Sequence, residues 1–383
     1  MLARLAFARL TTTALLASGC AADAAEEGDV DDTEEAVTAS PDLSAIFTVP
    51  KGDGKDDTTI EDALVGLVGK AAPGSSVRVA IFNWSRKNVA QAFVDAKKRG
   101  VDVKVVLDGD ENPIEPGNAI AILMSGLGKD NVTMCTRGKG SCIGDNINHN
   151  KFFLFSALTD GSKNVVVQSS QNFTKAQLGE HNNAVIVRND AKLYAGYLSY
   201  FQDLRDRKLN LAYDRELLGN KHVRTYVFPR VNDTVASVLD NVRCKKGESR
   251  IRVAMAFFTE ERAEVAQRLV DLQKRGCDVG VAMRKAGDGP VDASIIQRLK
   301  KGGVDVGLYP SENGNNIHSK YLLVDSPYEG ANGVSRRKLV FTGSHNYTGT
   351  ALHHNDETLA RVDDPAVFAA FAANWKTIKA QTK

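Results

Sequence analysis

Apolar runs alternate with amphipathic segments along the first half of the chain. Apolar residues fill the short runs 77–82 and 103–107, which predicts two buried strands. Between them, residues 88–99 carry apolar side chains at helical spacing and end at a glycine, which predicts a surface helix. Further helices are expected at 60–69 and 194–207. Strands that alternate with helices are typical of an α/β fold.

The second half of the chain repeats this order of elements. Helices are expected at 235–242, 262–275 and 368–379, and strands at 251–257 and 279–283. Both halves then contain a pair of strands that flanks a polar motif. The first pair is expected at 152–155 and 165–168, and the second at 321–324 and 338–342.

Residue identities show that the two halves arose by duplication. The hexapeptide KRGVDV at 98–103 recurs as KRGCDV at 274–279. In the same way, 174 residues separate Val77 from Ile251, and 174 separate Asn172 from Asn346. Collinear matches at a nearly constant offset indicate two copies of one domain rather than a short solenoid repeat.

The N-terminal part of the chain differs from the duplicated body in charge. Residues 1–57 carry 12 acidic and 4 basic side chains, which leaves 45 basic and 35 acidic side chains from Thr58 onward. A basic body favours an anionic partner such as phosphate, although the same charge also serves solubility. We therefore expect an export signal at 1–20, an acidic flexible tether at 21–57, and two domains at 58–212 and 213–383.

The first 20 residues have the features of a bacterial export signal. Arg4 and Arg9 precede a short apolar run at 10–17, and small residues then lead to Cys20. This order resembles a lipoprotein box, in which Cys20 is the lipidated first residue of the mature chain. The alternative is ordinary cleavage near residues 22–24, which yields a freely secreted protein.

Four cysteines follow the signal, at positions 135, 142, 244 and 277. An even number in an exported protein predicts two disulfides. Cys135 and Cys142 flank a short loop, and Cys244 and Cys277 precede expected neighbouring strands. The spacing of these cysteines does not resemble a zinc site, so we expect no metal.

The same polar motif follows the expected strands of both halves. His149 and Lys151 begin one strand and Ser170 and Asn172 end the next, and His318, Lys320, Ser344 and Asn346 repeat this arrangement. Alternation along a strand places the histidine and the lysine of each motif on one face. Lysine and asparagine can hold phosphate oxygens, and histidine can attack phosphorus or carry a proton. The motifs therefore predict phosphoryl chemistry.

The second motif, His318-x-Lys320 followed by Asp325 and then Gly343-Ser344-x-Asn346, resembles the HxKx4D signature of the phospholipase D superfamily. The first motif resembles it in part. This resemblance implies two similar α/β/α sandwich domains related by a pseudo-twofold axis, with the active site between them. It also implies a mechanism through a phosphohistidine, without metal or cofactor. The implied catalytic residues are His149, Lys151, Asn172, His318, Lys320 and Asn346, supported by Ser170, Asp325, Ser344 and Glu357.

The first motif departs from the family pattern. Ser156 stands where the motif aspartate is expected, and Asn183 lies at the position that Glu357 occupies after the second motif. We therefore expect Glu357 to orient His318, and His149 to lack a carboxylate partner. The family resemblance nevertheless implies that His149 is the nucleophile and His318 the acid and base.

Hydrolysis of a phospholipid headgroup ester to phosphatidate and an alcohol is the favoured function. A membrane surface as substrate agrees with an exported, basic protein that is either lipid-anchored or secreted, and which we expect to be a monomer. A metal-independent endonuclease is the first alternative, because the chemistry is the same for nucleic acid. A transferase similar to cardiolipin synthase and an inactive phosphoanion-binding module are the others.

Overall fold

A computed structural model describes residues 42–50, 56–220, 222–311 and 315–383. The expected export signal, the lipidation site at Cys20 and most of the expected tether lie outside these residues. The described residues belong to one compact unit. In the part of the chain that the structure describes, no helix has both the length and the apolar character needed to cross a bilayer.

The first half of the chain forms one mixed sheet. Its strand order is β1-β7-β6-β5-β2-β3-β4, and β13 from the second half pairs with β7. β2 and β3 run parallel, whereas β2, β5, β6, β7 and β1 are successively antiparallel. The strands are β1 (Leu43–Thr48), β2 (Ser76–Ile81), β3 (Asp102–Asp108), β4 (Val132–Cys135), β5 (Lys151–Ala157), β6 (Lys163–Ser169), β7 (Glu180–Val187) and β13 (Asn316–Ile317).

The second half forms a sheet with the corresponding core, in the order β12-β11-β10-β14-β15-β16-β9-β8. β10, β11 and β12 run parallel, as do β2, β3 and β4 in the first sheet. The strands are β8 (Glu216–Leu218), β9 (Val223–Phe228), β10 (Arg250–Met255), β11 (Asp278–Arg284), β12 (Asp305–Tyr309), β14 (Lys320–Gly330), β15 (Gly333–Gly343) and β16 (Glu357–Val362).

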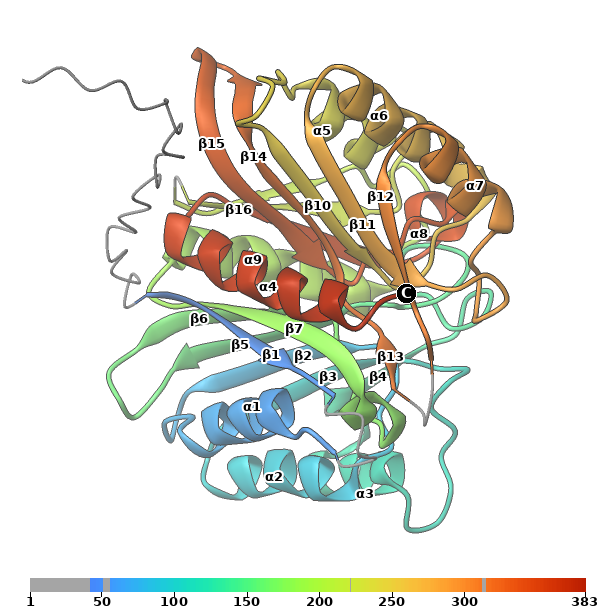
Figure 1. The fold of residues 1–383 in the computed structure, drawn as a ribbon. Coiled ribbons are helices and arrows are strands. Elements are labelled where there is room, and N and C mark those ends of the chain that lie inside the picture. Colours follow the sequence, from blue (N-terminus) through green and yellow to red (C-terminus); the bar gives the residue numbers. More distant parts are fainter. Residues whose placement is uncertain (1–41, 51–55, 221, 312–314) are drawn as a thin grey trace, which may run out of the picture. The chain divides into compact units, whose positions relative to one another are not determined.

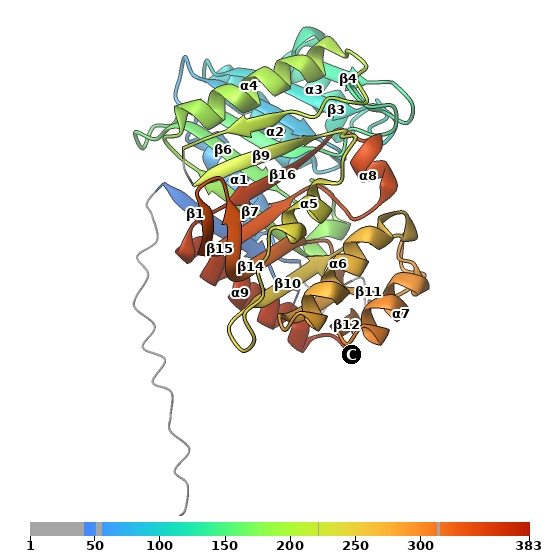
Figure 2. The same cartoon turned by 90° about the horizontal axis from the view of Figure 1, so that it is seen from above.

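Helices cover both sheets and also separate them (Figures 1 and 2). The outer layers are α1 (Thr59–Gly69), α2 (Lys87–Lys98) and α3 (Ala119–Leu127) on the first sheet, and α5 (Thr234–Asp240), α6 (Ala263–Lys274) and α7 (Ala293–Lys301) on the second. α4 (Ala191–Asp206) and α9 (Pro365–Ala380) lie between the sheets. α8 (Gly349–His353) and three short 3-10 turns complete the described elements.

The two middle helices begin in the same way and share one core. Asp190 accepts a hydrogen bond from the Leu193 amide at the start of α4, and Asp364 accepts from the first turn of α9. The buried side chains of both helices, together with the inner faces of both sheets, form a single hydrophobic cluster. This shared core explains why the halves form one unit rather than two separable bodies.

The structure confirms the duplicated α/β fold but corrects its N-terminal boundary. We expected residues 21–57 to be a tether, yet Leu43–Thr48 form β1, which pairs with β7 along its whole length. Leu43 is buried and Phe47 packs edge-on against Phe371 of α9, with ring centroids 4.9 Å apart. β1 is the counterpart of β9, because each pairs antiparallel with the last strand of its own copy, β7 or β16, and precedes the first helix of that copy.

Both expected disulfides are present. Cys135–Cys142 closes a loop after β4, and Cys244–Cys277 links the segments that lead into the neighbouring parallel strands β10 and β11.

Candidate active site

Each histidine motif is held by a strand of the other half. The His149 amide donates to the Asp356 carbonyl, just before β16, at 3.0 Å. The His318 amide donates to the His181 carbonyl of β7 at 2.9 Å. A side-chain hydrogen bond crosses the same boundary, in which Thr342 of the second half donates to the Asn183 side chain of the first half at 2.6 Å. The contacts are reciprocal, and the motifs meet where the two halves pack together.

The imidazole rings are oriented across the same boundary. Nδ1 of His149 lies 2.9 Å from both carboxylate oxygens of Glu357, which belongs to the second half. Nδ1 of His318 lies 2.9 Å from Oδ1 of Asn182, which belongs to the first half. The expectation that Glu357 orients His318 was therefore wrong, because β16 carries Glu357 to the opposite motif. His149 is the histidine with a carboxylate partner.

Asn182, rather than Asn183, is the counterpart of Glu357. The Ser170 amide donates to the carbonyl of Asn183, and the Ser344 amide donates to the carbonyl of Thr358. These equivalent bonds align Asn183 with Thr358, and therefore Asn182 with Glu357. The first half supplies an amide where the second half supplies a carboxylate.

The motif serines hold these two orienting residues. Ser344 Oγ donates to Glu357 at 2.5 Å, and Ser170 Oγ donates to Asn182 at 3.1 Å. Asn355 Nδ2 also donates to Glu357, at 3.1 Å. Burial raises the pKa of Glu357 to about 8, an effect that the nearby lysine charges oppose. The Glu357 carboxylate therefore accepts from Ser344 and Asn355 and lies beside Nδ1 of His149.

The two motif lysines are buried beside the histidines. Lys151 Nζ donates to the His149 carbonyl and Lys320 Nζ to the His318 carbonyl, both at 2.6 Å. Burial lowers the pKa of Lys151 to about 7 and places that of Lys320 well below its usual value. Among the described residues, neither ammonium group has a carboxylate within ion-pair distance. Both are placed to meet an anion that enters the site.

Burial and this positive charge also act on the histidines. The pKa values of His149 and His318 are both well below the usual value, first because the rings are buried and then because of the neighbouring cations. The charge of His149 also lowers the pKa of His318, as the smallest of these effects. Phe82 covers one side of the site, with its ring 5.1 Å from that of His149.

The motif asparagines follow the strands that end at the site. Asn172 Oδ1 accepts from the Asn83 amide at 3.2 Å, and Asn346 Oδ1 is buried without a protein partner among the described residues. Asp325 lies on β14, five residues beyond Lys320, or roughly 16 Å along an extended strand. It pairs with Arg336 at 2.7 Å and supports the β14–β15 hairpin, away from the histidines. The aspartate that Ser156 replaces is therefore not needed to orient His149.

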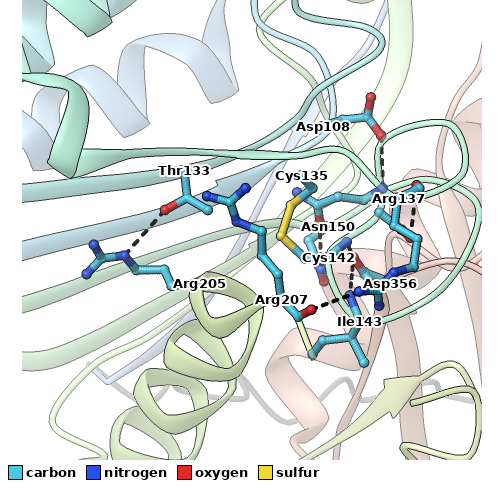
Figure 3. The surroundings of a disulfide bond; sticks show 12 residues. Asp108, Thr133, Cys135, Arg137, Cys142, Ile143, Asn150, Arg205, Arg207 and Asp356 are labelled. Atoms are coloured by element: carbon cyan, nitrogen blue, oxygen red, sulfur yellow. Dashed lines mark hydrogen bonds between the residues drawn. A yellow bond between two sulfur atoms is a disulfide. The ribbon is translucent and has the colours of Figure 1, made fainter. Parts of the chain in front are cut away.

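Two aspartates that the motifs did not indicate fix the loop before His149 (Figure 3). Asp356 accepts from the amides of Cys142, Ile143 and Gly144 at 2.6, 3.1 and 2.6 Å. Asp108, at the end of β3, accepts from the Asn148 amide at 2.9 Å. The Cys135–Cys142 disulfide closes the same loop. The only sequence signal for Asp356 was its place directly before Glu357.

Arg284 holds the second motif from the position that Asp108 occupies in the first half. It does so as a hydrogen-bond donor, whereas Asp108 is an acceptor. It ends β11, as Asp108 ends β3, and its Nε donates to the Ile317 carbonyl at 2.7 Å. Its Nη2 donates to Glu180 of the first half at 2.9 Å, and its guanidinium lies over the Phe257 ring. Glu180 therefore pairs with Arg284 and not with a histidine.

These features define a class: a duplicated α/β protein in which each half carries a buried histidine, lysine and asparagine set, and each histidine is held by residues of the other half. The family model described as "Cardiolipin synthase, PLD-like domain" matches residues 66–205 and 243–379. The chain belongs to this family of the phospholipase D superfamily, whose members are phosphodiesterases and phospholipid-modifying enzymes. A search of curated protein sequences finds no significant match.

Solved structures share this fold at low sequence identity. Phosphatidylserine synthase from Haemophilus influenzae is 12% identical, with a TM-score of 0.60, covering 89% of this chain and 87% of that one. Polyphosphate kinase from Porphyromonas gingivalis is 11% identical, with a TM-score of 0.56, covering 87% and 50%. Yeast tyrosyl-DNA phosphodiesterase is 10% identical, with a TM-score of 0.50, covering 84% and 89%. At these identities the likeness concerns the fold alone.

Proposed function

We propose that the protein hydrolyses the headgroup ester of a phospholipid to phosphatidate and a free alcohol, with His149 as nucleophile. The observation that carries this assignment is the bond between His149 Nδ1 and Glu357. A carboxylate at Nδ1 keeps the proton there, leaves the lone pair on Nε2, and stabilises the positive ring that forms during attack.

The proposed reaction has two steps. His149 Nε2 attacks phosphorus, the bond from phosphorus to the headgroup oxygen breaks, and His318 Nε2 gives that oxygen its proton. Water then attacks the phosphohistidine and His318 takes a proton from it, while the P–N electron pair returns to His149. Lys151, Lys320 and the motif asparagines hold the phosphoryl oxygens throughout.

His318 suits the second role because its Nδ1 partner is neutral. Oδ1 of Asn182 accepts a hydrogen bond from the Nδ1–H group but adds no negative charge, so His318 can gain and lose a proton at Nε2 without a fixed counter-charge. Anionic substrate raises the pKa of His318 and so supplies the protonated form that the first step requires. A basic protein body and a calculated charge of +10 after the expected tether favour an anionic surface as substrate.

The test separates lipid from nucleic acid. Purified protein is incubated in chelator with phosphatidylcholine vesicles, with phosphatidylglycerol vesicles and with plasmid DNA. We expect phosphatidate and free alcohol from the vesicles and intact DNA. Cleavage of DNA alone would identify an endonuclease instead. Inactivity of the wild type on every phosphodiester would favour the anion-binding module.

A second assay tests the intermediate and the fate of the phosphatidyl group. After quenching with denaturant at alkaline pH, a base-stable and acid-labile phosphoryl label is expected on His149 and absent from His149→Ala, and label on His318 instead would exchange the roles. The family model and the phosphatidylserine synthase neighbour make transfer to an alcohol a specific second candidate. Glycerol added to the vesicle assay distinguishes them, because a transferase yields a new phosphodiester at the expense of phosphatidate.

We also propose that the protein is exported and acts at the cell envelope as a monomer. The N-terminal sequence that ends at Cys20 supports export with lipidation at Cys20. The presence of both motifs in one chain supports a monomer. Cys20→Ser is expected to release the protein from the membrane fraction of the source cell. Unchanged membrane association would contradict lipidation.

A further inference from the structure

One side chain outside the motifs lies directly against the reactive nitrogen of His318. Gln177, in the 3-10 turn Ala176–Gly179, places its Nε2 3.0 Å from Nε2 of His318. Its Oε1 accepts a hydrogen bond from the Asn172 amide at 2.6 Å. The side chain is buried, with 8% of its surface exposed. Gln177 therefore connects the first motif to the histidine of the second.

Fixed partners determine which way the protons point. Asn182 Nδ2 donates to the Gln177 and Glu180 carbonyls, so its Oδ1 faces His318 and can only accept. The Nδ1 of His318 therefore carries a proton, and a neutral His318 has its lone pair on Nε2. The Gln177 amide, held by the Asn172 amide through Oε1, turns its N–H groups toward that lone pair. The resting site thus stabilises His318 as a base.

Among the described residues, no side-chain amide contacts Nε2 of the other histidine, His149. Gln177 lies five residues after Asn172, and the residue five positions after Asn346 is Ala351. Ala351 is buried on α8 and its methyl group offers no polar atom to His149. The duplicated site is therefore asymmetric at the reactive nitrogens as well as at their Nδ1 partners.

We propose that Gln177 is a positioning and specificity-determining residue that keeps Nε2 of His318 unprotonated until a leaving group takes over its amide N–H groups. This inference rests on the proposed function. The leaving oxygen has to approach the same nitrogen, so the amide must turn toward the departing alcohol. An alcohol with a second oxygen close to the ester, as in a glycerol headgroup, can accept those N–H groups. A choline headgroup has no such acceptor and leaves the amide unsatisfied.

The charges around His318 determine how it responds to a change at Gln177. Lys320 on β14, Arg284 on β11, Lys151 on β5 and His149 all face it and favour its neutral form. Glu180 offsets Arg284 through their ion pair, and Glu357 is engaged by His149. A carboxylate at position 177 would thus be the first anion in direct contact with the reactive nitrogen of His318.

The first measurement follows His318 itself and does not require turnover. NMR titration of histidine ring signals in the full-length protein is compared for wild type, Gln177→Glu, Gln177→Leu and Lys175→Ala. Gln177→Glu is expected to raise the midpoint of His318 by roughly one to two pH units, because a carboxylate replaces the amide. Gln177→Leu should raise it less. Lys175→Ala is the matched control, since Lys175 precedes the same turn but is exposed and pairs with Asp56. An unchanged midpoint in Gln177→Glu overturns the proposal.

The second measurement tests leaving-group preference. For each lipid, kcat/KM of a variant is divided by that of the wild type, which removes differences in vesicle binding. Gln177→Leu is expected to lose about tenfold with phosphatidylglycerol, the effect of one hydrogen bond, and less than about threefold with phosphatidylcholine. Equal losses with both lipids would reduce Gln177 to a structural role. If the wild type cleaves neither lipid, the proposed function fails, whereas the titration still decides whether Gln177 controls the proton.

Discussion

Above the pKa of about 8 that burial gives Glu357, its replacement by glutamine removes one negative charge from the partner of His149 with little change in shape. The carboxylate lies 2.9 Å from Nδ1 and is fully buried, so its attraction to a positively charged ring is little screened. For charge centres about 4 Å apart at an effective dielectric of 20, the interaction is about 4 kcal/mol. Each 1.36 kcal/mol is tenfold in rate, which gives a loss of about 10³-fold in kcat. The fold should persist, because the amide oxygen can still accept from Asn355.

The assay is kcat with phosphatidylcholine vesicles in chelator, with thermal unfolding to verify that the variant is folded. The matched control is Asp325→Asn, which also removes a buried carboxylate of the second motif. Asp325 contacts Arg336 and not a histidine, so we expect less than about a threefold change in kcat. If Glu357→Gln retained kcat within threefold of the wild type, or if Asp325→Asn caused the larger loss, the assignment of Glu357 to His149 would be refuted.

Two further predictions concern the anion site and the disulfides. Sulfate is a dianion near neutral pH, and we expect it to bind beside the two motif lysines. Because the pKa of Lys151 is lowered to about 7, binding above that pH requires the uptake of a proton. Its affinity should fall up to about 100-fold between pH 7 and 9, with proton uptake measured by calorimetry in two buffers, and a pH-independent affinity would contradict this. Loss of Cys135–Cys142 should cost about 2.5 kcal/mol of unfolding free energy, against about 3.8 kcal/mol for Cys244–Cys277. Replacing Cys135 and Cys142 by serine should nevertheless lower activity more than replacing Cys244 and Cys277, because the loop that Cys135–Cys142 closes binds Asp356. A larger loss of activity in the Cys244 and Cys277 variant would contradict this.

The sequence predicted the duplicated fold because its signals are local. Apolar runs, amphipathic helices and glycine ends occur twice at a constant offset, and each reports on a few neighbouring residues. β1 was missed since six strand residues lie within an acidic segment of low apolar content. Its stability comes from pairing with β7 and from Phe371 of α9, which lies more than 300 residues later in the sequence.

The candidate residues were found more reliably than their partners. Matching the motifs identified His149 and His318, but counting along one copy assigned Glu357 to the wrong histidine. No offset reveals which half supplies the strand beside a motif, because that depends on how the sheets pack. Asn182 and Gln177 were missed for the same reason, since each acts on a histidine of the other half.

The contacts that each half makes with the motif of the other half change the meaning of the degenerate first motif. The aspartate that Ser156 replaces corresponds to Asp325, which lies on the hairpin and does not reach a histidine. Meanwhile His149 receives its carboxylate from β16, and its loop is closed by Asp356 of the second half. His318 is held by β7 of the first half in the same way. Neither half carries a complete histidine environment, so the absence of an aspartate from the first motif does not remove the residues that hold His149, which come from the second half.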